Sequence, residues 1–164
     1  MPPTLKLATI LKDRLSGARK IAVLGIGSEF RGDDGAGMLV AETLHRKLKG
    51  RRKVKIFFGS TAPENLTGEI RKFKPTHLVI IDTIQIEDKP GTVLVLKPKD
   101  VGRGATFSTH MMPAKIMLDY LLRSLKCDVV IIGIQPDSIR FGRSISKKVS
   151  ASIKAVVFAV HDAL

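Results

Sequence analysis

Two adjacent carboxylates, Asp33 and Asp34, follow a glycine-rich turn that starts at Gly25. Gly27 and Gly32 have the glycine spacing of a phosphate-binding loop, but that loop continues with Lys and Ser or Thr, which meet phosphate and magnesium. Two carboxylates at this position would instead repel a phosphate. The turn is therefore typical of a loop that binds a cation or a hydrogen-bond donor. The structural alternative is that both acids only cap the following helix and complement its dipole.

Asp82 and His110 are two further candidates for chemistry. Ligands of an open α/β sheet bind beyond the carboxyl ends of its strands. Asp82 ends a very apolar strand expected at residues 78–82, and His110 precedes a helix expected from Pro113. Asp34, Asp82 and His110 are therefore expected at one rim, where carboxylate and imidazole ligands suit a divalent ion such as zinc or nickel. The alternative is that Asp82 only ends a strand and His110 is a loop histidine bonded to backbone.

Three other polar residues are also expected at the carboxyl edge of the sheet. Ser60 and Thr61 follow the second expected strand and Gln135 follows the last, so all three belong to the same rim. The remaining histidines form no HExxH or other local zinc motif and are expected to be structural: His45, His77 and His161. No GxSxG nucleophile motif occurs.

The elements that must position these residues follow from the apolar patterning. Strands are predicted at residues 20–24, 54–58, 78–82, 92–96 and 129–132. Helices are predicted at 33–48, 61–73 (with a capping box at Thr61), 113–125, and from a cap at Ser144 or Ser146 to 163. Residues 102–109 are predicted as a loop. The link after 78–82 is too short for a crossover helix, so strand 92–96 is expected to run antiparallel to it.

This alternation predicts an α/β fold, a three-layer α/β/α sandwich on a mostly parallel five-stranded sheet with one antiparallel strand. The 164 residues suit one domain, 1–164, in which residues 1–19 form a peripheral N-terminal helix (predicted at 5–15) and residues 20–164 form the core. No apolar run approaches the roughly 20 residues of a membrane span, and no signal peptide is visible, which favours a cytoplasmic location. The single Cys127 excludes an internal disulfide.

The net charge of +13 raises the prospect of an acidic partner, including nucleic acid. The densest basic block spans residues 45–55, at a predicted helix end where basic residues are favoured anyway. Aromatic residues are only 5% and Trp is absent, so a base-stacking surface is poorly supplied. A solvated basic face is favoured over a nucleic-acid footprint.

Several ordered motifs resemble one known family, the hydrogenase maturation endopeptidases, and within it the branch that matures hydrogenase 3 of formate hydrogenlyase. The resemblance covers nearly the whole chain from Ile21. It is carried by glycine, acidic, histidine and proline motifs in the family's order: Gly25-x-Gly27, Gly32-Asp33-Asp34-Gly35-Ala36-Gly37, residues 60–65, Ile80-Ile81-Asp82, Pro90-Gly91, Thr109-His110-Met111-Met112-Pro113 and residues 133–137. The family usually has Asn where this chain has Ser28.

The resemblance implies an endopeptidase that removes the C-terminal extension from a nickel-loaded precursor of a nickel-iron hydrogenase large subunit. It implies that Asp34, Asp82 and His110 contact the nickel, which the substrate carries and for which zinc or cadmium can substitute. Asp33 is left with helix capping, while Ser60, Thr61 and Gln135 are expected in the peptide groove. The attacking water can be activated by the metal or by an aspartate, in line with the aspartic-type grouping of the family.

Two other classes of function stay open from the sequence. One is a module that binds nucleic acid or another polyanion through the basic face. The other is a metal-dependent small-molecule hydrolase on the same fold, whose rim acids bind a metal of their own.

Overall fold

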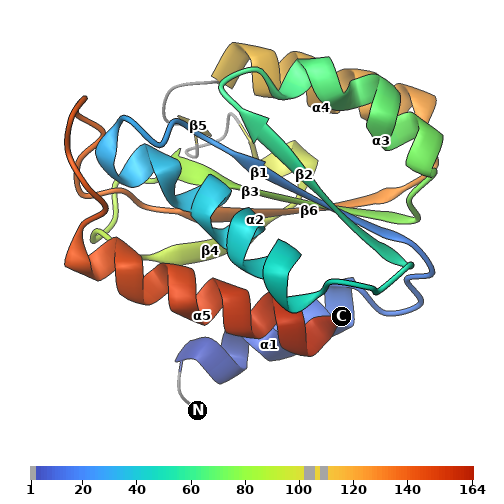
Figure 1. Ribbon diagram of the computed structural model, residues 1–164, viewed down its shortest axis with the longest axis horizontal. Helices are drawn as coiled ribbons and strands as arrows, with labels where there is room; N and C mark the ends of the chain where they lie inside the picture. The colour runs from blue at the N-terminus through green and yellow to red at the C-terminus, as the bar shows by residue number, and fades with distance from the viewer. Residues whose placement is uncertain (1–2, 102–105, 108–110) are drawn as a thin grey trace.

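A mixed β-sheet with the strand order β2-β1-β3-β6-β4 forms the middle layer of the protein (Figure 1). The computed structural model describes residues 3–101, 106–107 and 111–164. The strands of this layer, in chain order, are β1 (Ile21–Ile26), β2 (Val54–Ser60), β3 (His77–Gln85), β4 (Val93–Leu96) and β6 (Asp128–Ile134). β1, β2, β3 and β6 are parallel, and β4 runs antiparallel to β6.

Helices cover both faces of this sheet (Figure 1). On one face lie α2 (Ala36–Lys47) and α5 (Lys147–Ala163), and on the other lie α3 (Thr67–Phe73) and α4 (Met111–Ser124). The three-layer α/β/α sandwich predicted from the sequence is confirmed. Residues 78–81 of β3 are all apolar because both faces of the strand are covered: Leu78 and Ile80 pack toward α3 and α4, while Val79 and Ile81 pack toward α2 and α5.

The sheet differs from the prediction at two places. β4 has the predicted antiparallel direction, but its neighbour is β6, because β6 takes the position beside β3. The predicted loop 102–109 contains a two-residue strand, β5 (Thr106–Phe107), which pairs antiparallel with Ile84 and Gln85 of β3. A strand of two residues is too short to show an apolar pattern, so it could not be predicted from the sequence.

The helix starts also differ in detail. Two predicted helices begin with short 3-10 turns, η1 (Gly32–Gly35) before α2 and η2 (Pro63–Leu66) before α3; a third, η3 (Pro98–Asp100), follows β4. No side chain caps η2, so the capping box predicted at Thr61 is wrong. The cap of α5 is Ser146, whose hydroxyl accepts a hydrogen bond from the Val149 N–H at 3.3 Å, which confirms one of the two predicted candidates.

The N-terminal helix α1 (Pro3–Arg14) is more than a peripheral addition. It lies against α5 outside the sandwich (Figure 1) and buries Leu7, Ala8 and Leu11 in the same core cluster as α2 and α5. Lys12 Nζ lies 2.7 Å from Asp162 Oδ2 near the end of α5. The prediction of a peripheral extension therefore needs correction, because the apolar side of α1 completes the burial of α5.

Replacing Leu11 with Ala is therefore expected to destabilise the protein by about 2–4 kcal/mol, because the side chain is fully buried and its loss leaves a cavity. The measurement is urea unfolding followed by circular dichroism. Ile10→Ala is the matched control, because Ile10 lies in the same helix but is 38% exposed. If the two variants unfold at the same urea concentration, α1 does not contribute to the core.

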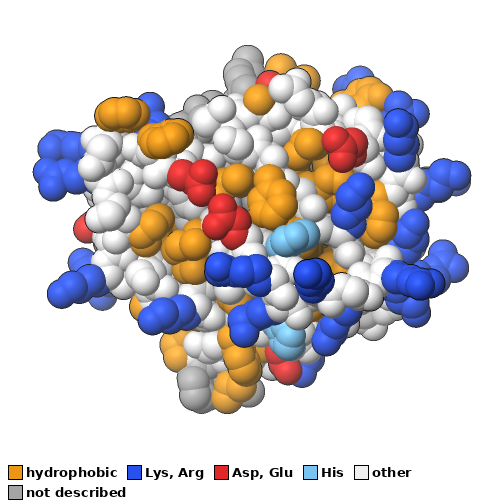
Figure 2. Space-filling view, in the orientation of Figure 1, with side chains coloured by type: hydrophobic (Ala, Val, Ile, Leu, Met, Phe, Trp, Pro, Cys, Tyr) orange, Lys and Arg blue, Asp and Glu red, His pale blue; other side chains and the backbone are white. Residues whose placement is uncertain are grey.

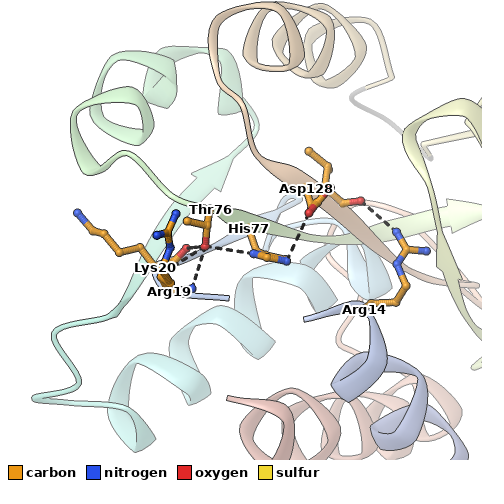
Figure 3. A network of polar contacts seen from close by, with 7 residues as sticks. Arg14, Arg19, Lys20, Thr76, His77 and Asp128 are labelled. Carbon is orange, nitrogen blue, oxygen red and sulfur yellow. Dashed lines mark hydrogen bonds and ion pairs between the residues drawn. The ribbon is translucent and has the colours of Figure 1, made fainter. Parts of the chain in front are cut away.

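A polar network joins the amino ends of the strands (Figure 3). The Thr76 hydroxyl accepts hydrogen bonds from the Arg19 and Lys20 N–H groups at 3.0 and 3.2 Å. His77 Nδ1 lies 3.1 Å from this hydroxyl and its Nε2 lies 3.6 Å from Asp128 Oδ2. The buried His77 thus links the starts of β3 and β6 at the edge opposite the candidate site, in agreement with the structural role predicted for it.

Candidate functional site

The loop between β1 and α2 brings Asp33 and Asp34 to the carboxyl edge of the sheet. After Ile26 the chain turns at Gly27, whose N–H donates to Ser60 O at 2.9 Å. The 3-10 turn η1 then leads into α2, where Gly37 lies so close to β1 and β3 that an added Cβ would stand 2.3 Å from both Ile26 O and Ile81 O. This close approach places the start of α2 directly over the strand ends, and both aspartates are fully buried.

Asp34 is held by two neighbouring segments. Its Oδ2 accepts a hydrogen bond from the Ser28 N–H at 2.9 Å, and its Oδ1 accepts one from the Thr83 hydroxyl at 3.1 Å. The first bond uses the backbone of residue 28, so the presence of Ser where the family usually has Asn does not remove it. The carboxylate is therefore fixed in orientation at the rim.

Asp82 lies at the same rim and is 1% exposed. Its Oδ1 accepts a hydrogen bond from the Thr83 N–H at 2.7 Å, whereas its Oδ2 has no hydrogen-bond partner among the residues that the structure describes. Burial, and secondly the charge of Asp34, raise the pKa of Asp82 well above its ordinary value, while the bond from Thr83 opposes them. A buried carboxyl with one unengaged oxygen beside a second carboxylate is suited to receive a cation or exchange a proton.

Thr83 links these two acids. Its N–H donates to Asp82 and its hydroxyl donates to Asp34, and its side chain is fully buried. Successive residues of a strand point to opposite faces, so Asp82 and Thr83 lie on different sides of the sheet and the hydroxyl faces the α2 side. Thr83 is thus a positioning residue that the sequence analysis did not single out, because only the register of β1 and β3 reveals its contact with Asp34.

Asp33 does not cap a helix, and that prediction is wrong. No side chain caps η1 or α2. Its carboxylate instead accepts three backbone hydrogen bonds from the segment before α5: Oδ2 from Asp137 at 2.8 Å and Ser138 at 3.2 Å, and Oδ1 from Ser146 at 2.6 Å. A buried carboxylate with three N–H donors fastens that distant segment to the glycine-rich loop.

Asp33→Ala is consequently expected to destabilise the protein by about 3 kcal/mol, well above the loss of a cap, because three N–H groups lose a charged acceptor. Urea unfolding measures this change, and hydrogen exchange should show lost protection at residues 137, 138 and 146. Asp137→Ala is the control, because that side chain is exposed and only its N–H takes part. A loss of only about 1 kcal/mol would restore the capping interpretation.

The third predicted ligand, His110, lies outside the described residues. Phe107, which pairs with Ile84, and Met111, the first residue of α4, are the nearest described residues on either side. Within the described part of the chain, no group of three or more His, Cys, Asp or Glu residues is arranged to hold a metal ion. The structure therefore brings Asp34 and Asp82 together, and the place of His110 stays a prediction.

The predicted groove residues divide into two kinds. Ser60 and Thr61 are exposed at the end of β2, with Ser60 in the left-handed region at a φ of 48°. Gln135 is buried, and its amide donates to Gln85 Oε1 at 2.9 Å and accepts from the Ile86 N–H at 2.8 Å. The contacts of Gln135 indicate that it braces the end of β3, since both ends of its amide are engaged within the protein.

No helix in the described residues is long and apolar enough to cross a membrane.

Comparisons with known proteins identify the family and support the fold. The sequence model of a family described as hydrogenase maturation protease matches residues 38–163. The hydrogenase 3 maturation protease of Escherichia coli K12 is 33% identical over 134 residues, which are 82% of this chain and 84% of that protein. The crystal structure of the NiFe hydrogenase maturation protease HycI from Thermococcus kodakarensis KOD1 matches with a TM-score of 0.85 at 32% identity, covering 94% of this chain and 98% of that chain. The solution structure of the endopeptidase HycI from Escherichia coli matches with a TM-score of 0.72 at 29% identity, over 85% and 87% of the two chains.

Proposed function

This chain belongs to the hydrogenase maturation protease family, and from that membership we propose that it removes the C-terminal extension from a nickel-loaded precursor of a hydrogenase large subunit. Its residues Asp34, Asp82 and His110 would contact the nickel that the precursor carries. The proposal concerns the nickel, the ligand set and the C-terminal bond, which family membership alone does not specify.

The observation that carries this proposal is the buried Oδ2 of Asp82, beside Asp34, for which the described part of the chain offers no hydrogen-bond partner. A buried carboxyl oxygen without a hydrogen-bond partner reduces the stability of a protein, and such unfavourable groups are expected mainly at functional sites. Oxygen ligands of this kind, with an imidazole, suit a borderline divalent ion. His110 is the proposed third ligand: it follows Phe107 by three residues in the sequence, and Phe107 pairs with Ile84, two residues beyond Asp82.

The chemistry then follows from the electrostatics of the pair. The approach of the nickel would favour the charged form of Asp82 and oppose the rise in pKa that burial causes, so Asp82 would act as a carboxylate when the substrate is bound. Such a carboxylate can take a proton from the attacking water and return it to the amine that leaves from the scissile peptide. The nickel would supply a positive charge that polarises this water. Both ways of activating the water are compatible with the same pair of acids.

The basic block is not continuous with this site. Its residues lie in the last turn of α2, in the turn before β2 and at the start of β2, at the amino edge of the sheet, whereas Asp34 and Asp82 lie at the carboxyl edge. A polyanion function would therefore use a different surface and would not explain the buried pair.

The test is cleavage of the large-subunit precursor of the same organism, purified with and without nickel and followed by the mobility shift of the shortened product. We expect cleavage only of the nickel-loaded form. The hydrogenase 3 maturation protease of Escherichia coli, acting on its own precursor, is the positive control. Cleavage of both forms would remove nickel recognition, and an intact precursor in both, with the positive control active, would remove the proposed function altogether.

A further inference from the structure

Two loops at the carboxyl rim are hydrogen-bonded into one unit, here called the rim platform and defined as residues 28–35 and 136–146. The Gly142 N–H donates to Phe30 O at 2.9 Å, and the Gly32 N–H donates to Arg143 O at 3.0 Å. The Asp33 N–H donates to Ser138 O at 2.9 Å, in addition to the three bonds that the Asp33 carboxylate accepts. The second loop is thus fixed relative to Asp34, which lies in the first.

This platform carries the two most exposed large hydrophobic side chains of the described residues. Phe30 is 71% exposed and Phe141 is 80% exposed, and the hydrogen bond between Phe30 and Gly142 places their segments side by side. A single exposed hydrophobic residue needs no explanation, but two aromatic residues on a rigid unit beside a candidate active site indicate an interaction surface. Aromatic residues are enriched among those that dominate binding energies.

The platform also carries exposed charged side chains, namely three arginines and the acids Glu29 and Asp137. Arg31, Arg140 and Arg143 are exposed, and none of them forms an ion pair with a described residue. Figure 2 shows hydrophobic and basic side chains close together at the left edge of the molecule, over the loop that precedes α5 and the turn after β1. Arg31 follows Phe30 and Arg140 precedes Phe141 in the sequence, and such pairs of a guanidinium and an aromatic side chain fit a partner surface that combines apolar side chains with carboxylates.

We infer that the rim platform is the docking surface for the folded large-subunit precursor, with Phe30 and Phe141 as apolar anchors and the three arginines facing carboxylates of the precursor. This inference rests on the proposed function. A stable protein complex buries about 800 Å² on each partner, so recognition extends beyond the immediate surroundings of Asp34 and Asp82. The platform is the adjoining surface, and its hydrogen-bonded loops lose little conformational entropy when they bind.

The experiment compares the steady-state cleavage of nickel-loaded precursor by the wild type and by a Phe30→Ser/Phe141→Ser double variant. We expect KM to rise about tenfold or more while kcat stays within about twofold, because docking but not the acids is altered. Phe158→Ser is the matched control, since Phe158 lies on α5 outside the platform and is 49% exposed. A second variant, Arg140→Glu/Arg143→Glu, should raise KM and reduce its dependence on salt.

The outcomes separate this inference from the proposed function. If the wild type does not cut the precursor, the proposed function fails. If the wild type cuts it and the double Phe variant has the KM of Phe158→Ser, the docking inference is overturned. A fall in kcat at unchanged KM would also overturn it, because the loops would then act on the chemistry. Thermal unfolding of each variant checks that the exposed substitutions leave the fold intact.

Discussion

Asp82→Asn is expected to reduce cleavage of the nickel-loaded precursor by about 10²–10⁴-fold while leaving the protein folded. The amide keeps an oxygen for the Thr83 N–H, which lies 2.7 Å from Asp82 Oδ1, so the end of β3 retains its geometry. The amide, however, can neither take a proton from water nor provide a negatively charged oxygen for a cation. Steady-state assays under saturating precursor measure this loss directly.

The same substitution is expected to change how stability depends on pH. The pKa of Asp82 is raised above the ordinary value of 3.8, so the folded protein holds this proton more tightly than the unfolded chain does. The stabilisation that this gives is complete below that ordinary value, and it is lost as pH rises through the raised pKa. Asp82→Asn has no such proton, so its stability should decline less over that range, and at higher pH it should equal or exceed the wild type.

Urea unfolding of both proteins at a series of pH values, without added metal, tests this point. Asp13→Asn, an exposed carboxyl on α1, is the control for a simple loss of charge. Parallel stability curves for the wild type and Asp82→Asn would mean that Asp82 titrates normally. Wild-type cleavage rates in Asp82→Asn would remove this residue from the site.

The architecture was predictable where burial leaves a pattern in the sequence. β3 is covered on both faces, so residues 78–81 are apolar without interruption, and helices with one buried side alternate with such strands. The neighbour of β4 was not predictable, because the choice between β3 and β6 depends on which strand arrives beside β3 from later in the chain. The role of α1 in the core was missed because its apolar side is buried only by α5, which lies more than 130 residues later in the sequence.

In the candidate site, too, some features were predictable from the sequence and others were not. Asp34 and Asp82 were predicted to meet because both were expected at the carboxyl ends of strands; β1 and β3 are indeed neighbours, although β3 continues three residues beyond Asp82. Asp33 was misassigned because its partners are backbone N–H groups 104 to 113 residues away, and backbone donors carry no residue type to detect. The bridging hydroxyl of Thr83 was likewise invisible, since it depends on a register set by the whole sheet.

Gly27→Ala is expected to have the largest structural effect, a loss of more than about 4 kcal/mol or failure to fold, because two penalties coincide. The residue has a φ of 131°, which side chains rarely adopt, and an added Cβ would stand 1.7 Å from Asp34 O. Asp34 O is a backbone atom and cannot move aside as a flexible side chain would, so the glycine-rich loop itself would have to move. Any protein that folds should therefore also lose cleavage, since the loop orients Asp34.

Gly50→Ala provides the matched control. Gly50 also has a positive φ, 88°, but no atom lies within 4 Å of an added Cβ. The Gly50→Ala variant should lose only about 1–2 kcal/mol of stability, from the unfavourable backbone conformation. It should keep full activity, because the turn before β2 lies at the amino edge of the sheet. Thermal and urea unfolding rank the two variants. If Gly27→Ala resembles Gly50→Ala in stability and still cuts the precursor, the close contact between Gly27 and Asp34 does not shape the site.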